Sequence, residues 1–334
     1  MAVAGQAFSP KEFQVWIASD NTDAGISGIH ASNMYQLDVD SVGMPSLNVN
    51  QVLDVRSGVG RTLKDEDVFQ DNTLRVVELS ISGTIHNDAG HKLLLQNICN
   101  DVNDDIAVAT GFSPASQLYG AGNAVANGSS SLTVVIKSSD HTNQRSLVMS
   151  GLVVTSFSLS ADSTTEGGRY KFSATLQSGV KPDLNESSTL AGNNAYANTT
   201  DCFLSSGSGV KVFDTDVILQ NFTTTIESPA VFTGFYADGY QQVSRGAEIA
   251  VTAEATVKYD ANTKTFIHDF DTQTIAKDGN MFVITNNNAF GVNMQNGVLT
   301  DVTYNEGDVM MLDVAMKAVD DGTDALISFD VTTG

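Results

Sequence analysis

One alternating stretch occurs twice in this sequence, first as Glu78-Leu79-Ser80-Ile81-Ser82-Gly83-Thr84-Ile85 and again, 172 residues later, as Ala250-Val251-Thr252-Ala253-Glu254-Ala255-Thr256-Val257. The odd-numbered residues of both copies are apolar or small, and most even-numbered residues are polar. This alternation is typical of a β-strand with one buried and one solvent-facing side. The residues expected on the polar side are Glu78, Ser80, Ser82, Thr84, Thr252, Glu254 and Thr256.

An Asp-Ala-x-x-Lys element follows each copy, at residues 88–92 and at residues 260–264. Because an aspartate side chain accepts hydrogen bonds from the free amides of a first helical turn, we expect a helix to start at each aspartate. Later in the chain, 156–159 and 301–304 carry apolar residues at the same two positions, which matches Phe157 with Val302. The recurring order of elements indicates a duplicated folding unit.

The two copies are separated by a stretch of different composition, 179–200, which is rich in Asn, contains Pro182 and Gly192, and is poor in large apolar residues. It is typical of a linker, so we predict one domain at 1–178 and another at 201–334. Each domain is predicted to hold strands, one helix and a final pair of strands. The expected fold class is therefore α+β and β-dominated, with each domain a β-sandwich or partial barrel.

Charge and composition limit the function. The 334 residues include 39 acidic and 17 basic ones, for a net charge of −22, which opposes binding to nucleic acid or to an anionic membrane surface. Two interpretations of the acidity stay open, solubility alone or a functional role. Neither a signal peptide nor an apolar run of membrane-spanning length is present in the sequence, so we expect no membrane anchor. Cys99 and Cys202 are expected to be small buried hydrophobes.

Motifs of catalysis are not found. The sequence has no nucleophile elbow, P-loop or dinucleotide-binding glycine motif, and its acidic runs lack the Gly and Glu of a calcium loop. His86 and His91 are five residues apart, which does not fit a zinc helix, and both are expected on the surface. We therefore predict no catalytic residue, cofactor or metal, and a protein that is not an enzyme. A hydrolase would need converging carboxylates, which no spacing here indicates.

Two long polar segments precede the repeated strands, at 56–77 and at 228–246. Segments of this length are often binding loops, and large apolar residues inside them would be poorly covered on a lone domain. We predict that they contact a neighbouring subunit or ring; the alternative is a hairpin with its own minor core. The predicted contact residues are Leu63, Val68, Phe69, Phe232, Phe235, Tyr236 and Tyr240.

The order of elements resembles that of the major tail tube proteins of long-tailed bacteriophages. The segments that carry the resemblance are 79–95 with 153–176, and 251–270 with 298–316. Two such units in one chain resemble the members that form trimers with pseudo-sixfold symmetry. The resemblance implies a virion tail protein, made in the host cytoplasm, whose rings stack around a lumen. The implied partners are other copies of the chain, the tape-measure protein, tail-end proteins, and double-stranded DNA that passes without specific binding.

Other interpretations remain. Tube proteins of secretion systems share the implied fold, and a monomeric β-rich surface-binding module would present an aromatic patch at 232–240. The polar strand face has two possible orientations. It lines the lumen if the resemblance holds, or it faces outer solvent, because alternation fixes which residues share a face but not which face is inside.

Overall fold

The computed structural model describes residues 13–19, 34–45, 50–53, 68–71, 77–86, 88–101, 106–108, 118–119, 131–138, 146–186, 202–204, 207–235, 241–245, 248–272, 279–286 and 290–331. These residues form a β-dominated α+β fold, as the sequence predicts, with large antiparallel sheets. Among them are two α-helices, α1 (Ala89–Cys99) and α2 (Phe266–Asp271). None of the described helices is long and apolar enough to cross a membrane.

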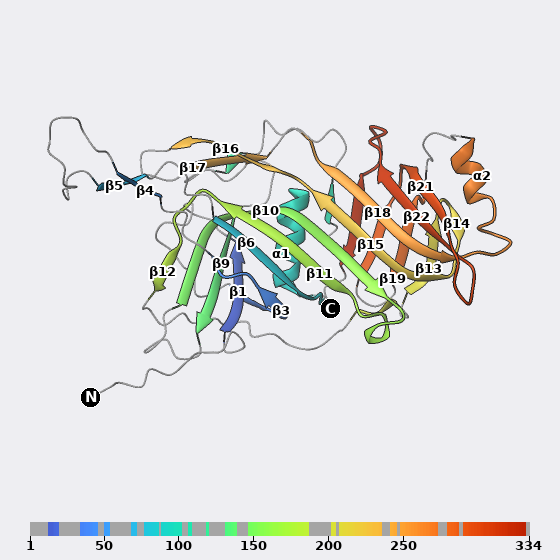
Figure 1. The fold of residues 1–334 in the computed structure, drawn as a ribbon, viewed down its shortest axis with the longest axis horizontal. Helices are drawn as coiled ribbons and strands as arrows, with labels where there is room; N and C mark the ends of the chain where they lie inside the picture. The colour runs from blue at the N-terminus through green and yellow to red at the C-terminus, as the bar shows by residue number, and fades with distance from the viewer. Residues whose placement is uncertain are drawn as a thin grey trace.

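A long antiparallel sheet extends across the molecule (Figure 1). Its strands pair in the order β3, β6, β11, β10, β15, β18, β22, β21. Their bounds are β3 (Val39–Val42), β6 (Val77–Thr84), β10 (Ser146–Asp162), β11 (Lys171–Ser178), β15 (Leu219–Glu227), β18 (Ala250–Lys258), β21 (Gly297–Asn305) and β22 (Met311–Ala318). Strands from both halves of the chain therefore belong to one sheet.

This order contains the same four-strand unit twice. The repeated stretches are β6 and β18, and each lies between a preceding strand (β3 or β15) and the second strand of a final hairpin (β11 or β22). The first strand of that hairpin (β10 or β21) comes next. We call β3-β6-β11-β10 the first unit and β15-β18-β22-β21 the second unit. The two units are joined where β10 pairs with β15, which we call the internal junction.

Each unit also has strands of a second layer. In the first unit these are β2 (Tyr35–Leu37), β1 (Phe13–Ser19), β9 (Leu132–Ser138), the N-terminal part of β10, and β12 (Asp183–Glu186). In the second unit they are β14 (Thr215–Asp216), β13 (Gly207–Val212), β19 (Phe282–Asn286), β20 (Phe290–Met294) and β23 (Ile327–Val331). The short strand β7 (Ile106–Val108) pairs with β23, so a strand of the first half also extends the second layer of the second half.

The core lies on one side of the long sheet and continues through both units. Across the internal junction, Phe157 of β10 stands opposite Ile226 of β15, and both side chains are 1% exposed. Helix α1 packs against β10 and the second layer, behind the long sheet in Figure 1. Because one cluster of buried side chains includes residues of both units, the junction is packed like a domain interior.

The two helices begin differently. Asp88 is the N-cap of α1 and accepts a 2.9 Å hydrogen bond from the His91 amide, as the sequence predicts. Asp260 instead accepts from the Asn262 amide at 2.8 Å inside a turn, and α2 begins only at Phe266. The expectation that a helix starts at Asp260 is therefore wrong. Its side chain closes the turn, an arrangement that Asp favours as readily as a helix cap.

A hairpin precedes the repeated strand in each unit. The first consists of β4 (Asn50–Leu53) and β5 (Val68–Asp71), and Figure 1 shows it extending away from the layers. The second consists of β16 (Ala230–Phe235) and β17 (Gln241–Arg245), and β17 also pairs with β8 (Leu118–Tyr119) of the first half. Both hairpins leave the long sheet at the same end, which we call the hairpin end. The turns that join β10 to β11 and β21 to β22 lie at the opposite, turn end.

The predicted boundaries at residues 178 and 200 remain predictions. The segment expected to be a linker begins with β12, which pairs with β10, and residues 187–200 lie outside the described residues. Cys99 and Cys202 are both free and buried, as expected.

Candidate functional site: a polar sheet face and two open edges

One face of the long sheet is polar from the first unit to the second. Register places Ser82, Ser173, Ser158, Thr225 and Thr252 in a continuous row across five neighbouring strands. The parallel row toward the hairpin end contains Ser80, Thr175, Ser156 and Glu227. Because these side chains alternate with the buried ones, the polar face is the side of the sheet that the core does not cover.

The polar face carries more negative than positive charge. Its charged residues, taken by register from all strands of both units, are Glu78, Asp162, Glu227, Glu254, Asp301, Asp313, Lys171, Lys258 and Lys317. Six carboxylates against three ammonium groups leave three negative charges on the face of each chain. Small hydroxyl side chains fill most of the remaining positions, so the face is smooth, hydrated and acidic.

The residues predicted to be exposed on this face fall into two groups. Glu78, Ser80, Thr252 and Glu254 are exposed, and Ser82 is partly exposed. Thr84 and Thr256 belong to the same face by register but are only 2% and 8% exposed. For these two, the expected exposure is wrong.

A longer neighbouring side chain covers each of the two threonines. Lys171 Nζ donates to Thr84 Oγ1 at 3.2 Å, and Thr256 Oγ1 donates to Asp313 Oδ1 at 2.6 Å. Lys171 and Asp313 occupy the same position in the two units, because each lies directly opposite the threonine of the repeated strand. A longer side chain on the neighbouring strand therefore buries each threonine, although alternation alone predicts that it is exposed.

The predicted contact residues are placed only in part. Phe232 is partly buried and packs with Ala230 against Val153, so in the single chain it connects the second hairpin to the first unit. The backbones of Val68 and Phe69 belong to β5, and that of Phe235 belongs to β16, but their side chains lie outside what the structure describes. Leu63, Tyr236 and Tyr240 lie outside the described residues altogether. A contact of these residues with a second copy remains a prediction.

The second hairpin is anchored to the first unit by a buried arginine that the sequence analysis missed. Arg245 is 3% exposed, and its guanidinium donates to the carbonyl oxygens of Val154, Ser228 and Asn97, the last at 2.6 Å. Asn97 lies in the last turn of α1, which has no basic residue of its own there. Arg245 therefore supplies a cation to the negative end of the helix dipole from the other half of the chain.

The histidines expected on the surface are buried. His86 is 3% exposed with Nε2 3.0 Å from Asp38 Oδ2, and His91 is 1% exposed with Nδ1 2.8 Å from Asp88 Oδ1. Each ring thus has a carboxylate partner that makes its burial possible. Burial by itself would raise the pKa of Asp88, but its hydrogen bonds and charge interaction with His91 hold that pKa below its ordinary value.

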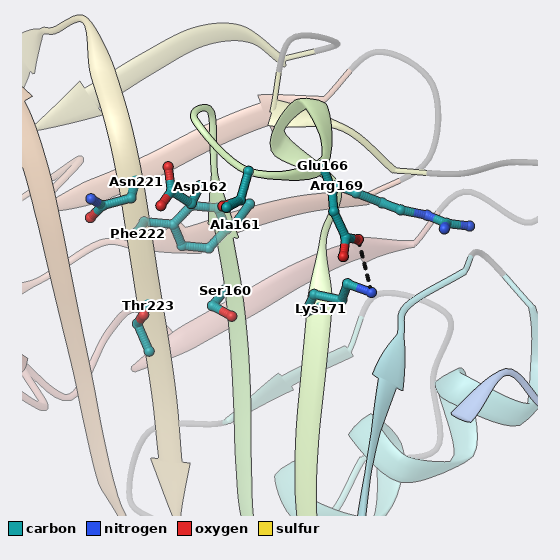
Figure 2. Close-up of a pocket in the computed structure, with 10 residues that line it drawn as sticks. Ser160, Ala161, Asp162, Glu166, Arg169, Lys171, Asn221, Phe222 and Thr223 are labelled. Atoms are coloured by element: carbon teal, nitrogen blue, oxygen red, sulfur yellow. Dashed lines mark ion pairs between the residues drawn. The ribbon is translucent and has the colours of Figure 1, made fainter. Parts of the chain in front are cut away.

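A hollow of about 350 Å³ lies at the turn end of the internal junction (Figure 2). Lys171 Nζ lies 3.0 Å from Glu166 Oε2 and 2.9 Å from Asp40 Oδ2. Burial alone would lower the pKa of Lys171, but these carboxylates raise it above its ordinary value. Because both carboxylates already engage the ammonium group, this lysine is not free to bind an anion. Among the described residues, no group of three or more metal-ligating side chains is present.

Among the described strands, the long sheet ends in two edges, β3 at one end and β21 at the other. In the repeat, β3 corresponds to β15 and β21 corresponds to β10. At the internal junction, the Ser163 amide donates to the Gln220 carbonyl oxygen, which marks the odd-numbered residues of β10 as those that bond to β15. The matching residues of β21 are Val302 and Tyr304, because Val302 and Leu159 stand opposite equivalent residues of their hairpins.

Backbone groups at both edges point away from the sheet. On β3, Gly43 donates to the carbonyl oxygen of Ser80 on β6, so the amide and carbonyl of Val42 point outward. Side chains at the edges are also less covered than their counterparts at the junction. Tyr304 is 49% exposed, whereas the matching Ala161 is 5% exposed. The two edges have the form of the two halves of a junction that a single chain leaves open.

No protein-family model matches the chain, and no curated protein matches it in sequence.

Proposed function

We propose that this chain is a structural subunit that joins head to tail with its own copies into closed rings, and that stacked rings form the tube of a bacteriophage tail. The observation that carries the proposal is the repeated four-strand order. It has one internal junction, β10 with β15, and two outer edges, β21 and β3, that have no further strand beside them among the described residues. If β21 pairs with β3 of the next copy, every junction in the assembly is of one kind.

Strand direction and register are consistent with this pairing. All neighbouring strands of the long sheet are antiparallel, so β21 and the next β3 also meet antiparallel. The junction pairs Leu159 with Thr224, and the equivalent pairing between copies joins Val302 to Val42. Each of the two edges then finds the hydrogen-bond partners that it lacks in the single chain.

Side-chain sizes also fit. At the internal junction, the small Ala161 lies opposite the large Phe222. Between copies, the large Tyr304 would meet the smaller Val39, so each pair again combines one large and one small side chain, with their order reversed. Core contacts depend on such size complementarity. A free edge that presents a half-exposed tyrosine beside small valines is therefore complementary to its own partner.

The arrangement of layers supports the polar face as the lining of the lumen. The helix α1 and the second-layer strands cover one face of the long sheet, and Ser, Thr and acidic side chains occupy the other. When a sheet closes into a barrel, the covered face must lie outside, because the second layer has no room within the closed ring. The polar face, with Glu78 and Glu254, would then form the inner wall.

An acidic, hydroxyl-rich inner wall suits a conduit for DNA. Binding of DNA draws its affinity from cations that replace counterions on the phosphates, and a face with three net negative charges per chain offers no such gain. Two units per chain make a ring of three copies pseudo-sixfold, as expected from the resemblance to duplicated tail tube proteins. The tape-measure protein, tail-end proteins and passing DNA are the partners that the proposal implies.

Two other functions predict different assemblies. A secretion-system-type tube would use the same junctions with a different cargo. A monomeric surface-binding module would leave β3 and β21 unpaired in solution. Negative-stain images and sedimentation of the purified protein test the proposal: rings or tubes of three-copy rings are expected, and a protein that stays monomeric at high concentration contradicts it.

A further inference from the structure

Large exposed apolar side chains are found only at the two ends of the long sheet, within the parts of the chain that the structure describes. The seven are Met44, Ile218, Val231, Tyr304, Val309, Met310 and Val319. Four of them lie at the turn end and three at the hairpin end, as their strands and registers show. Between these ends, the exposed side chains of the polar face are hydroxyl or charged residues.

Three of the residues at the turn end form one patch. Ile218, Val309 and Met310 are 60%, 59% and 41% exposed. The carbonyl oxygen of Ile218 accepts from the Lys258 amide at 2.9 Å, and that of Met310 accepts from the next amide, Tyr259, at 3.1 Å. These residues therefore flank the end of β18 on both sides. We call them the turn-end patch.

The fold itself does not require apolar residues at this place. In the first unit, the turn that corresponds to Glu306–Met310 is Ser163–Gly168, whose exposed side chains are hydroxyls and Glu166. A turn with polar residues thus closes the same hairpin in the same chain. Exposed apolar residues that a turn does not need are a sign of an interaction surface.

The hairpin end carries the second apolar surface. Met44 follows β3 and is 45% exposed, Val231 lies in β16 and is 46% exposed, and Val319 follows β22 and is 36% exposed. This set, which we call the hairpin-end patch, lies at the opposite end of the sheet, with Val231 and Val319 in the second half of the chain and Met44 beside the β3 edge of the first unit. Two different surfaces on opposite ends of a subunit produce a head-to-tail contact that repeats without closing.

We propose that the turn-end patch of one copy packs against the hairpin-end patch of another copy in the adjacent ring, and that this contact is the axial bond of the tube. The inference rests on the proposed ring-forming function, but it uses neither strand edge. Lateral closure through β21 and β3 would make rings, and the two patches would join one ring to the next. The occupant of each patch is thus a second copy of this chain.

Charge gives this contact a distinctive salt dependence. The exposed Glu306 and Asp308 outnumber Lys258 beside the turn-end patch, and the exposed Asp320 and Asp321 outnumber Lys317 beside the hairpin-end patch. A net negative charge would therefore lie on each side of the contact. At about 0.1 M salt, charges more than about 10 Å apart are largely screened. Apolar stacking against like charges should therefore strengthen as salt is raised, whereas stacking through ion pairs should weaken.

The experiment compares three variants by negative stain and pelleting over a range of protein and salt concentrations. The double variant Val309→Ser/Met310→Ser removes most of the turn-end patch and leaves the Met310 backbone hydrogen bond possible. Val319→Ser changes the opposite patch. Ser163→Ala, at the equivalent polar turn, is the matched control.

For both patch variants we expect intact rings and at least a tenfold higher concentration for tube formation, about the effect of losing a partly buried aliphatic side chain in each subunit. The control should form tubes like the unchanged protein, and salt should lengthen its tubes. Tubes from the double variant at the unchanged concentration would overturn this inference while leaving the rings in place. A protein that never forms rings would instead overturn the proposed function.

Discussion

A proline in the edge strand β21 tests the ring junction without removing a hydrogen bond between β21 and β22. Tyr304 lies in β21, and its amide points away from β22, toward the place where the next copy would bind. Tyr304→Pro removes this N–H donor and puts the pyrrolidine ring of proline in its place. Proline is tolerated on an edge strand whose N–H faces solvent, so the isolated chain should stay folded.

The size of the effect follows from the junction. The internal junction joins seven residue pairs, Ser156↔Glu227 through Asp162↔Asn221, but β3 has only four residues, so the proposed junction is shorter. Loss of one donor leaves a buried acceptor without a partner, which costs about 1–3 kcal/mol. Each junction should weaken by about 5- to 150-fold. A ring of three closes three junctions, so it should lose about 3–9 kcal/mol.

Tyr304→Ala is the matched control, because it loses the same contact with Tyr259 but keeps the amide. Thermal melts should show that both variants are folded with similar stability. Analytical ultracentrifugation should show assembly by the alanine variant at a moderately raised concentration and a monomer for the proline variant. If the proline variant assembles as readily as the alanine variant, the amide of Tyr304 faces no partner and the reasoning about the edge is wrong.

Three further predictions concern the wall, the anchor and the helix cap. In assembled tubes, Glu254→Cys should react with a small maleimide but not with a maleimide on a large polymer. His268→Cys, on the exposed face of α2, should react with both reagents. Equal reaction of the two sites with the large reagent would place the polar face outside. Arg245→Ala should lower the free energy of unfolding by about 3 kcal/mol, because it leaves several buried carbonyl groups without their charged donor, and a loss below about 1 kcal/mol in urea titrations would contradict this account. Asp88→Ala should cost about 1 kcal/mol at pH 7, and Asp88→Asn should cost less because asparagine also caps helices. Because the pKa of Asp88 is lowered in the folded chain, its charge-dependent stabilisation is complete above its ordinary pKa of 3.8 and is lost as pH falls below that value. The stability of the wild type should therefore approach that of Asp88→Asn between pH 5 and about pH 2. A difference in unfolding free energy that stays constant over this range in urea titrations would refute this.

Local sequence patterns predict the parts of this fold that depend on neighbouring residues. The alternation in β6 and β18 and the cap of α1 at Asp88 need only two-residue periodicity and one side chain beside free amides. The duplicated order is visible in the sequence and returns in the strand order of the two units.

Long-range pairing is not predicted by these patterns. Alternation has a period of two, so a shift of two residues leaves every side chain on the same face. For this reason the sequence comparison matched Phe157 with Val302, whereas the register matches Leu159 with Val302. The pairing of β10 with β15 and the anchoring of Arg245 on α1 depend on residues at least 59 positions apart, and no local pattern marks them.

Burial of polar residues also depends on distant partners. His86 is inside because Asp38 meets its ring, and Thr84 is covered because Lys171 lies across the strands. The partner of His91 is local, because Asp88 precedes it by three residues. The sequence analysis did not identify the individual residues of the open edges, although the sequence contains a signal for them. Val302 and Tyr304 continue the apolar alternation to the last strand of the sheet, where Val302 is buried but Tyr304 remains 49% exposed.

A disulfide between copies tests the central claim most directly. Ser160 and Thr223 stand opposite each other at the internal junction, at a position where opposed residues are not hydrogen-bonded to each other, and the equivalent pair between copies is Thr303 with Ser41. Such pairs lie about 4.5 Å apart between Cα atoms, which suits a disulfide. Because Cys99 and Cys202 are buried, they should not interfere.

Oxidised Ser160→Cys/Thr223→Cys protein should therefore run as a single cross-linked chain on a non-reducing gel. We predict that oxidised Ser41→Cys/Thr303→Cys protein gives covalent dimers and trimers that end at three chains. If it stays monomeric under conditions in which the Ser160→Cys/Thr223→Cys control forms its disulfide, β21 does not pair with β3 of another copy, and the head-to-tail ring is contradicted.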